Sequence, residues 1–233
     1  MKKEIGLLIN LLLIMGIFLF CTTNCNKKSD NIAVNDTTVM DADGNVYHFD
    51  TIGTQIWMRE NLKTTKFNDN SLIPMVLDGA EWNNLTMPAC CWYNNDIMNE
   101  ETYGTLYNWY AVNSGILCPK GWHVPSDAEW TTLINNVGNA SNAGGFLKES
   151  LTTHWTVPNT GATNSVRFTA LPGGSRFSNG LFYTQNNNGF WWSSTPSSTT
   201  EAWQRIMSYN STVVVRISDI KYLGLSVRCI KNN

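Results

Sequence analysis

Three groups of residues have the types and spacing that chemistry at a protein site would use. The first is a run of alternating oxygen ligands, in which Asp41, Asp43 and Asn45 follow the opening pattern of a calcium-binding loop. Gly44 stands at the wrong position for such a loop, and Ile52 occupies the place of the bidentate glutamate. We therefore expect a simple turn here.

Paired carboxylates form the second group, because two carboxylates together can act as general acid and base. Asp127 and Glu129 stand at the start of a predicted helix, where Ser126 and Glu129 have the spacing of a capping box. Glu129 therefore has a structural role, and Asp127 points elsewhere on the helix. No nucleophile, base and orienting group assemble in the sequence, so we expect no enzyme activity.

The third group is the cysteines. Cys90, Cys91, Cys118 and Cys229 allow three pairings. Adjacent Cys90 and Cys91 rarely bridge each other, because the short ring strains the peptide between them, and we predict a Cys118–Cys229 disulfide. In the chain-entropy model a loop of this length is worth about 4.7 kcal/mol. Cys90 and Cys91 are then buried thiols, or one of them is an odd partner.

A metal or cofactor site does not follow from these residues. Cysteine and histidine would have to share a zinc-type spacing. The three histidines do not stand at ligand spacing from any cysteine: His48, His123 and His154. We predict no metal and no cofactor.

The N-terminus has the pattern of a bacterial lipoprotein signal over residues 1–25. Two lysines precede an apolar stretch over 5–20, which is shorter than the roughly 20 residues of a membrane span. We predict acylation of Cys25, behind the small polar residues 22–24; Cys21 is the alternative, with Phe18 and Phe20 in its cleavage site. An ordinary signal peptide or an uncleaved anchor would also fit the pattern.

This pattern gives a domain organisation and a location. Residues 26–37 are polar and predict a flexible tether, and 38–231 have the length of one folded domain. Acyl chains would hold the protein on a membrane. We therefore expect an exported, membrane-anchored lipoprotein at the outer membrane or cell surface.

Composition favours recognition over catalysis. Lys and Arg total 16 against 18 Asp and Glu, and without a basic stripe we expect no nucleic-acid partner. Asn, Ser and Thr supply 29, 17 and 24 of the 233 residues, beside 10 Trp, 8 Tyr and 9 Phe. Such a neutral surface of amides, hydroxyls and aromatic rings suits ligand binding.

Secondary-structure elements must position these residues. The sequence predicts a hairpin and helices before residue 138 and β strands from residue 168 onward. Turn signals at Gly44 and Gly53 predict a hairpin over 39–62. Helices are predicted after Ser126, ending at Gly138, and over 106–112. From Phe168 onward short apolar runs separated by turn residues predict a β meander, with strands over 168–171, 182–183, 190–193, 202–209, 212–217 and 225–230.

Period-two alternation in strand 202–209 divides its side chains between two faces. One face carries a bulky set and the other a more changeable set: Trp203, Arg205, Met207 and Tyr209 against Gln204, Ile206 and Ser208. We expect the working surface of the protein on this late meander.

Seven ordered blocks resemble the Fibrobacter succinogenes major paralogous domain, a family of exported and surface lipoproteins. The blocks are 53–62, 91–96, 103–112, 117–127, 168–174, 191–195 and 225–229, and the resemblance as a whole covers about residues 38–231. Residues 123–130 are also similar to the segment with which formylglycine-generating enzymes enter a helix. The resemblance implies an α+β, C-type lectin-like fold of twisted, mainly antiparallel sheets with two main helices and long loops.

In such folds a cysteine beside the first helices often pairs with one in the last strand, which agrees with Cys118 and Cys229. No cysteine lies between them, so the paired reactive cysteines of the formylglycine-generating enzymes are missing and their oxidase chemistry is not implied. Related lectin-like domains present a late sheet-and-loop surface with variable side chains. By position, that ligand-binding surface would include Gln204, Ile206, Ser208, Val215, Ile217, Asp219 and Tyr222.

The function expected from these features is ligand binding or adhesion by a lipid-anchored module. Its partner would be a glycan or a host or cell-surface protein. Ile206, Val215 and Ile217 are apolar residues that a plain solvent face seldom combines, although packing in the interior would also account for them. A structural envelope protein without a soluble ligand is the alternative function, and an enzyme with the formylglycine-generating-like fold is a third.

Overall fold

The computed structural model describes residues 37–83 and 85–232. The predicted signal peptide, the acylation site at Cys25 and nearly all of the predicted tether lie outside the described residues. Within the described part, five helices and mainly antiparallel strands form one α+β unit. None of the helices described there is long and apolar enough to cross a membrane.

The first sheet joins the beginning and the end of the described chain. The predicted hairpin is confirmed, because β2 pairs with β3 across a turn in which Gly53 has φ +62°. The last strand, β12, lies between β3 and β6. The five strands in sheet order are β1 (Thr38–Met40), β2 (Val46–Ile52), β3 (Gln55–Met58), β12 (Ile230–Lys231) and β6 (Trp122–His123).

The second sheet contains the late meander. Its order is β11 (Val215–Ile220), β10 (Glu201–Ser208) and β9 (Asn188–Pro196), all antiparallel. Bridges from Trp191 to Ser226 and from Leu225 to Tyr107 continue it into the strand pair β4–β5. The result is a curled half-barrel. The remaining strands are β4 (Cys90–Cys91), β5 (Leu106–Tyr107), β7 (Ser175–Arg176) and β8 (Phe182–Tyr183).

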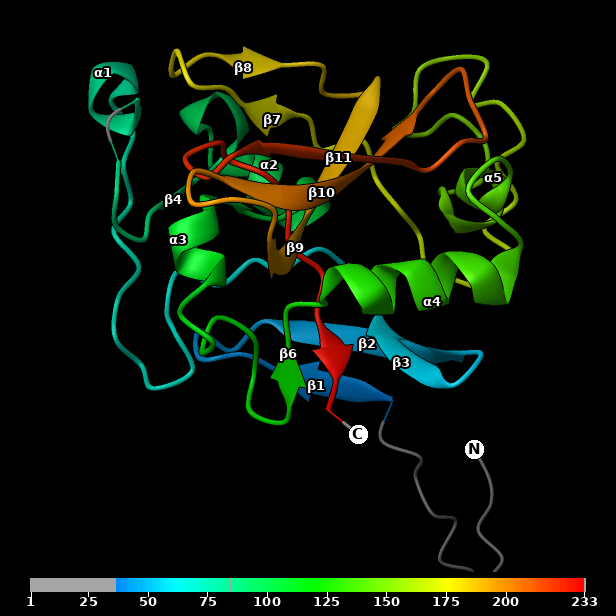
Figure 1. The fold of residues 1–233 in the computed structure, drawn as a ribbon, viewed down its shortest axis with the longest axis horizontal. Helices are drawn as coiled ribbons and strands as arrows, with labels where there is room; N and C mark the ends of the chain where they lie inside the picture. The colour runs from blue at the N-terminus through cyan, green and yellow to red at the C-terminus, as the bar shows by residue number, and fades with distance from the viewer. Residues whose placement is uncertain (1–36, 84, 233) are drawn as a thin grey trace, which may run out of the picture. The chain divides into compact units, whose positions relative to one another are not determined.

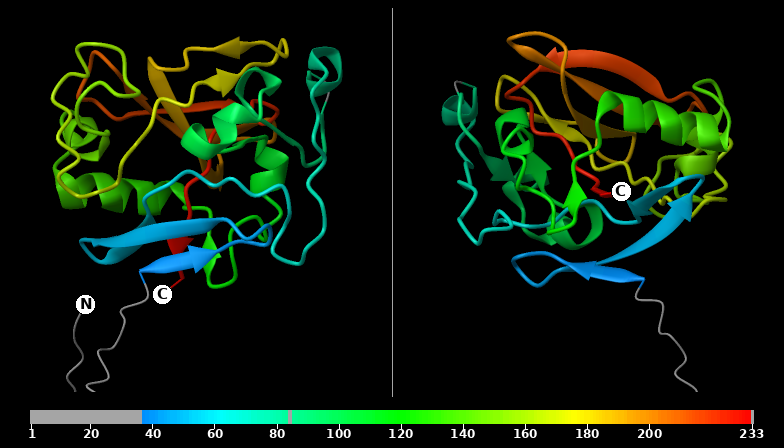
Figure 2. Two further views of the ribbon diagram at one scale, coloured as in Figure 1. Left: turned by 180° about the vertical axis from the view of Figure 1, so that it is seen from behind. Right: turned by 60° about the horizontal axis from the view of Figure 1, so that its bottom comes forward.

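Helix α4 (Asp127–Val137) lies between the two sheets, both in the first view and from behind (Figures 1 and 2). The predicted capping box is confirmed, since Ser126 and Glu129 bond reciprocally, and Gly138 follows the last turn. Trp130, Leu133 and Ile134 are buried on the helix. They share a core cluster with residues of both sheets, among them Ile52, Trp57, Trp191 and Met207.

The structure has five helices in its described part, where two main helices were predicted. Four short helices accompany α4, namely α1 (Gly79–Trp82), α2 (Met98–Tyr103), α3 (Trp109–Val112) and α5 (Ala143–Leu147), with a 3-10 turn η1 (Tyr93–Asn95). The helix predicted over 106–112 is limited to α3, because 106–107 pair with β4 and Asn108 caps the helix by accepting from the Ala111 N–H.

Three predicted strands are shorter than expected or missing. The strand over 168–171 does not form in the described chain, because Arg167 and Thr169 have φ +57° and +53° and turn the chain there. The strand over 212–217 begins only at Val215, because the preceding segment pairs with the loop before α5, with Val214 N donating to Ala140 O. Of the run over 225–230, only Ile230 belongs to a regular strand.

The long loops are held by buried cations. Lys148, Arg176 and Arg228 are fully buried, and each donates to backbone carbonyls of irregular segments. Lys148 Nζ alone donates to three carbonyls at 2.9–3.1 Å. Because buried carbonyls outside helices and sheets need other donors, these side chains replace the missing ladder bonds.

The predicted Cys118–Cys229 disulfide is confirmed. It joins the loop after α3 to the residue before β12, with Cα atoms 6.1 Å apart and 111 residues between them in sequence. Cys90 and Cys91 are buried free thiols, which was the first of the two alternatives expected for them. Burial raises the pKa of Cys91 to about 12, so its thiol stays protonated and unreactive at neutral pH.

Candidate functional site

The predicted ligand-binding residues lie mostly on one face of β10 and β11. Ile206 is directly opposite Val215, and Gln204 is opposite Ile217, so each pair points to the same face. Val215 and Ile217 are 39% and 38% exposed, and β11 is the outer strand of its sheet. Ile206 is half-buried and packs against the central core. The structure thus brings the three apolar residues of the prediction together.

Gln204 is an exception to the expected exposure. It is only 2% exposed, and its Nε2 donates to Asp219 Oδ2 at 3.3 Å. The reason is that β10 is the middle strand of the sheet, with buried residues on both of its faces, and its pairing with β9 shifts register between Ala202 and Gln204. Gln204 is therefore inaccessible to a ligand in this conformation.

The other three predicted residues are half-buried. Burial raises the pKa of Asp219, whose carboxylate also accepts from the Ile220 N–H. The Ser208 carbonyl accepts a hydrogen bond from buried Lys148, which fixes the end of β10. Tyr222 follows the end of β11. Of these three, Ser208 and Asp219 lie on the same face of β10 and β11 as the apolar trio.

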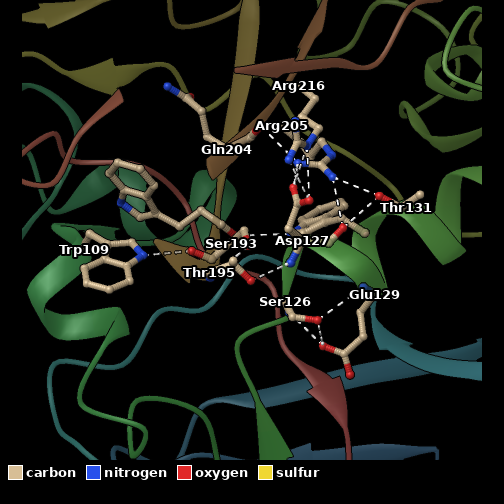
Figure 3. A network of polar contacts seen from close by, with 12 residues as sticks. Trp109, Ser126, Asp127, Glu129, Thr131, Ser193, Thr195, Gln204, Arg205 and Arg216 are labelled. Atoms are coloured by element: carbon tan, nitrogen blue, oxygen red, sulfur yellow. Dashed lines mark hydrogen bonds and ion pairs between the residues drawn. The ribbon is translucent and has the colours of Figure 1, made fainter. Parts of the chain in front are cut away.

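A polar network beneath the sheet ties β10 and β11 to α4 (Figure 3). Asp127 accepts from Arg205 Nη1 at 2.8 Å and from Arg216 Nε and Nη2, both at 2.9 Å. The Asp127 N–H donates to Thr195 Oγ1 at 3.0 Å, which adds the end of β9. The guanidinium of Arg216 also stacks on the Trp203 ring, 3.4 Å from its centroid. Three strands are thereby fixed on the first turn of one helix.

Both carboxylates of the rejected catalytic pair are held ionised by structural partners. Burial works against ionisation of Asp127, but hydrogen bonds from Arg216 and Arg205 outweigh it and hold its pKa below the ordinary value. For Glu129, burial is likewise outweighed by His123 and Ser126, which lower its pKa to about 2. The hydrogen bond to Glu129 raises the pKa of His123 in turn. Neither carboxylate is suited to take up a proton near neutral pH.

Comparison with known protein families identifies the domain. The Fibrobacter succinogenes major domain (Fib_succ_major) matches residues 51–231, well over half of the chain. The chain belongs to this family. No curated protein and no solved structure matched the sequence. The family thus confirms the resemblance seen in the ordered sequence blocks, while the described structure supplies the α+β architecture.

Most tryptophans of this Fib_succ_major domain pack in its interior. Eight of the ten tryptophans are buried, and only Trp92 and Trp203 are partly exposed. Trp203 is covered by Arg216. The structure therefore presents fewer indole faces for stacking on sugars than the composition indicates.

The turn at Asp41 resembles no calcium site. Its carboxylate accepts from the backbone N–H groups of Asp43 and Asn45 and from the Tyr47 hydroxyl. Asp43 is engaged by Lys66 at 3.0 Å and by the Thr65 N–H. The simple turn expected from the sequence is confirmed, and within the described residues no three acidic, His or Cys side chains are placed to hold a metal ion.

Sequence reasoning missed a second feature of the domain, an open cavity of about 590 Å³. It lies beside the same turn, and loops distant in sequence form its walls. The lining residues are Asp43, Asn45, Thr65, Leu72, Ile73, Pro74, Met75, Trp92, Ile97 and Glu100. The sequence signal that could have indicated this cavity is the apolar pair Ile97 and Met98, which stands next to two glutamates in a polar stretch. In the structure these two side chains are 56% and 79% exposed.

Proposed function

We propose that this domain is an exported, lipid-anchored binding or adhesion module that contacts its partner through β10 and β11. The observation that carries the proposal is the exposure of Val215 and Ile217 on one face of the outer strand of their sheet. Neighbouring exposed apolar side chains on an edge strand are typical of contact sites. Anchoring through Cys25 and a location at the outer membrane or cell surface belong to the same proposal.

A protein partner fits this surface better than a glycan. Sugar recognition relies on exposed aromatic faces, yet the predicted surface contains aliphatic side chains and its nearest indole, Trp203, is stacked under Arg216. An outer strand offers backbone groups and alternate side chains to a second polypeptide. Val215 and Ile217 are two such alternate side chains, so we favour a host or cell-surface protein.

We further propose that the domain has the C-type lectin-like fold that its sequence implied. The supporting observations are the disulfide from the helical part to the last strand and the late antiparallel sheet that α4 supports. In this proposal the Asp127 network makes the contact surface rigid before the partner arrives. A preorganised surface loses less conformational entropy on binding.

The experiment compares binding to arrays of glycans and of host and bacterial surface proteins. The probe is the full-length protein in detergent, alongside a Val215→Ser/Ile217→Ser variant. Both changes replace exposed residues, so the fold should persist. The matched control is Met40→Ser/Val46→Ser, which alters two residues exposed at 61% and 49% on β1 and β2.

We expect the wild type and the control to bind the same proteins, and the β11 variant to bind them at least about tenfold more weakly, as for loss of buried apolar contacts. Equal binding by all three proteins would contradict the proposed surface. Binding to glycans alone would overturn the choice of partner. No binding by any of them would favour the structural envelope role.

A further inference from the structure

We propose a second binding site in the cavity beside the Asp41 turn, which accepts an alkylammonium group such as the side chain of a lysine in a polypeptide. The site is independent of the β10–β11 surface, because its lining residues all precede position 101. Its volume of about 590 Å³ falls within the usual range of ligand pockets. The ligand needs an apolar alkyl chain to pack on the apolar wall of the cavity and a terminal positive charge to pair with its carboxylate.

The walls of the cavity match the alkyl chain. Leu72 and Ile97 are exposed at 72% and 56%, and the wall between them is made by Ile73, Pro74 and Met75. Exposed leucine and isoleucine side chains gathered around one hollow leave apolar surface in water. A chain of methylene groups would cover that surface, whereas a sugar or a phosphate would not.

The charge of the cavity matches the ammonium group. Glu100 lines it, and no lysine or arginine of the described chain lies within ion-pair distance of its carboxylate. The nearest cations have other partners, since Lys63 pairs with Glu101 at 3.2 Å and Lys66 pairs with Asp43 at 3.0 Å. Burial raises the pKa of Glu100, and the hydrogen bond from Trp92 and the charge of Lys63 only partly offset it. A bound ammonium group would supply a cation at ion-pair distance.

Trp92 also lines the cavity, beside the apolar wall and Glu100. Its buried Nε1–H faces the Glu100 carboxylate, and the hydrogen bond between them partly offsets the effect of burial on the Glu100 pKa. Because Trp92 contacts Glu100, its indole reports on any cation that this carboxylate binds. The indole also attracts cations through its ring. Together with Glu100 it selects a cationic ligand over a neutral one.

The test uses the indole signals of the full-length protein, labelled with ¹⁵N at tryptophan and held in detergent. Pentylammonium, a minimal lysine side chain, is titrated against pentanol, which has the same alkyl chain without charge. The Trp92 signal is identified by its absence from Trp92→Phe. The variants are Glu100→Gln and Glu101→Gln, which lose the same charge, although only Glu100 lines the cavity.

We expect pentylammonium to shift the Trp92 signal saturably and to bind at least about fivefold more tightly than pentanol. Glu100→Gln should lose this difference and Glu101→Gln should keep it. The other tryptophan signals report whether each variant is folded. An unmoved Trp92 signal, equal affinity for the two probes, or equal loss in both variants would overturn the proposal.

Discussion

Two partly buried carboxylates, Asp127 and Glu100, show how differently this domain treats similar groups. Asp127 receives hydrogen bonds from both Arg205 and Arg216, and they hold its pKa below the ordinary value despite burial. Glu100 has no cation of the described chain at ion-pair distance, and burial raises its pKa. The first carboxylate fixes a helix to a sheet, whereas the second stands at the wall of an open cavity.

The contrast teaches where to look for function in a domain without catalytic groups. A carboxylate whose partners are all present stabilises the fold, and its removal should be costly. A carboxylate that is partly buried without a cation lowers the stability of the folded protein, so it marks a place to look for a ligand that supplies the charge. The β10–β11 surface depends on the first kind and the alkylammonium site on the second.

The largest expected effect comes from removing the Cys118–Cys229 disulfide. In the Cys118→Ser/Cys229→Ser variant the unfolded chain has more conformational entropy, because residues 118 and 229 are no longer joined across a loop of 111 residues. We expect the free energy of unfolding to fall by about 4 kcal/mol, measured by urea denaturation. Wild-type protein under reducing conditions is the control and should match the variant. A loss below about 1 kcal/mol would show that the disulfide contributes little to the stability of the fold.

Local sequence signals predicted the parts of the fold that local chemistry decides. The capping box at Ser126 and Glu129, the turn at Gly53 and the apolar spacing on α4 all depend on residues within one or two turns of each other. These local features need no knowledge of distant contacts. The Cys118–Cys229 disulfide was predicted as well, with the support of the family resemblance, in which a cysteine beside the first helices often pairs with one in the last strand.

The remaining parts depend on partners far away in sequence. Residues 106–107 form a strand instead of a helix because 90–91 pair with them. Gln204 is buried because β10 has neighbours on both sides, which its alternation alone does not reveal. The cavity combines segments around Asp43, Leu72 and Trp92, and no periodic pattern links them. Only the three-dimensional structure brings these together.

The second effect tests Asp127 itself. Asp127→Asn keeps the shape of the side chain but removes the charge that faces Arg205, whose side chain is 1% exposed. We expect a loss of about 2 kcal/mol in the free energy of unfolding, because a buried guanidinium is left without a counter-charge. Urea denaturation at neutral pH measures it. An unchanged midpoint would contradict the structural role of the network.

Asp127 and Glu100 should change the pH dependence of the free energy of unfolding in opposite directions. The folded pKa of Asp127 is lowered from 3.8, so its contribution is present above that pH and is lost as the pH falls through the folded pKa. The folded pKa of Glu100 is raised from 4.5, so stability falls as the pH rises from about 4.5 through the raised value.

Urea midpoints between pH 3 and 7 for the wild type, Asp127→Asn and Glu100→Gln measure both slopes. Asp127→Asn should lose part of the acid sensitivity. Glu100→Gln should instead lose the decline above pH 4.5. Identical profiles for the two variants would remove the distinction between the carboxylates.

The smallest effect is the one expected for Glu100→Gln at neutral pH. A neutral amide avoids the cost of burying an unpaired charge, so the free energy of unfolding should stay the same or rise slightly. Glu101→Gln is the matched control; its carboxylate is 90% exposed and its pair with Lys63 is worth little. A clear loss of stability in Glu100→Gln alone would assign Glu100 a structural role.

The most direct test is a titration of both carboxyl groups in one sample, followed by the ¹³C shifts of the Asp127 and Glu100 side chains without any ligand. The account predicts a pKa below 3.8 for Asp127 and above 4.5 for Glu100. A Glu100 pKa at or below 4.5 would show that the protein already satisfies this carboxylate. The contrast between the two regions, and the alkylammonium site with it, would then be wrong.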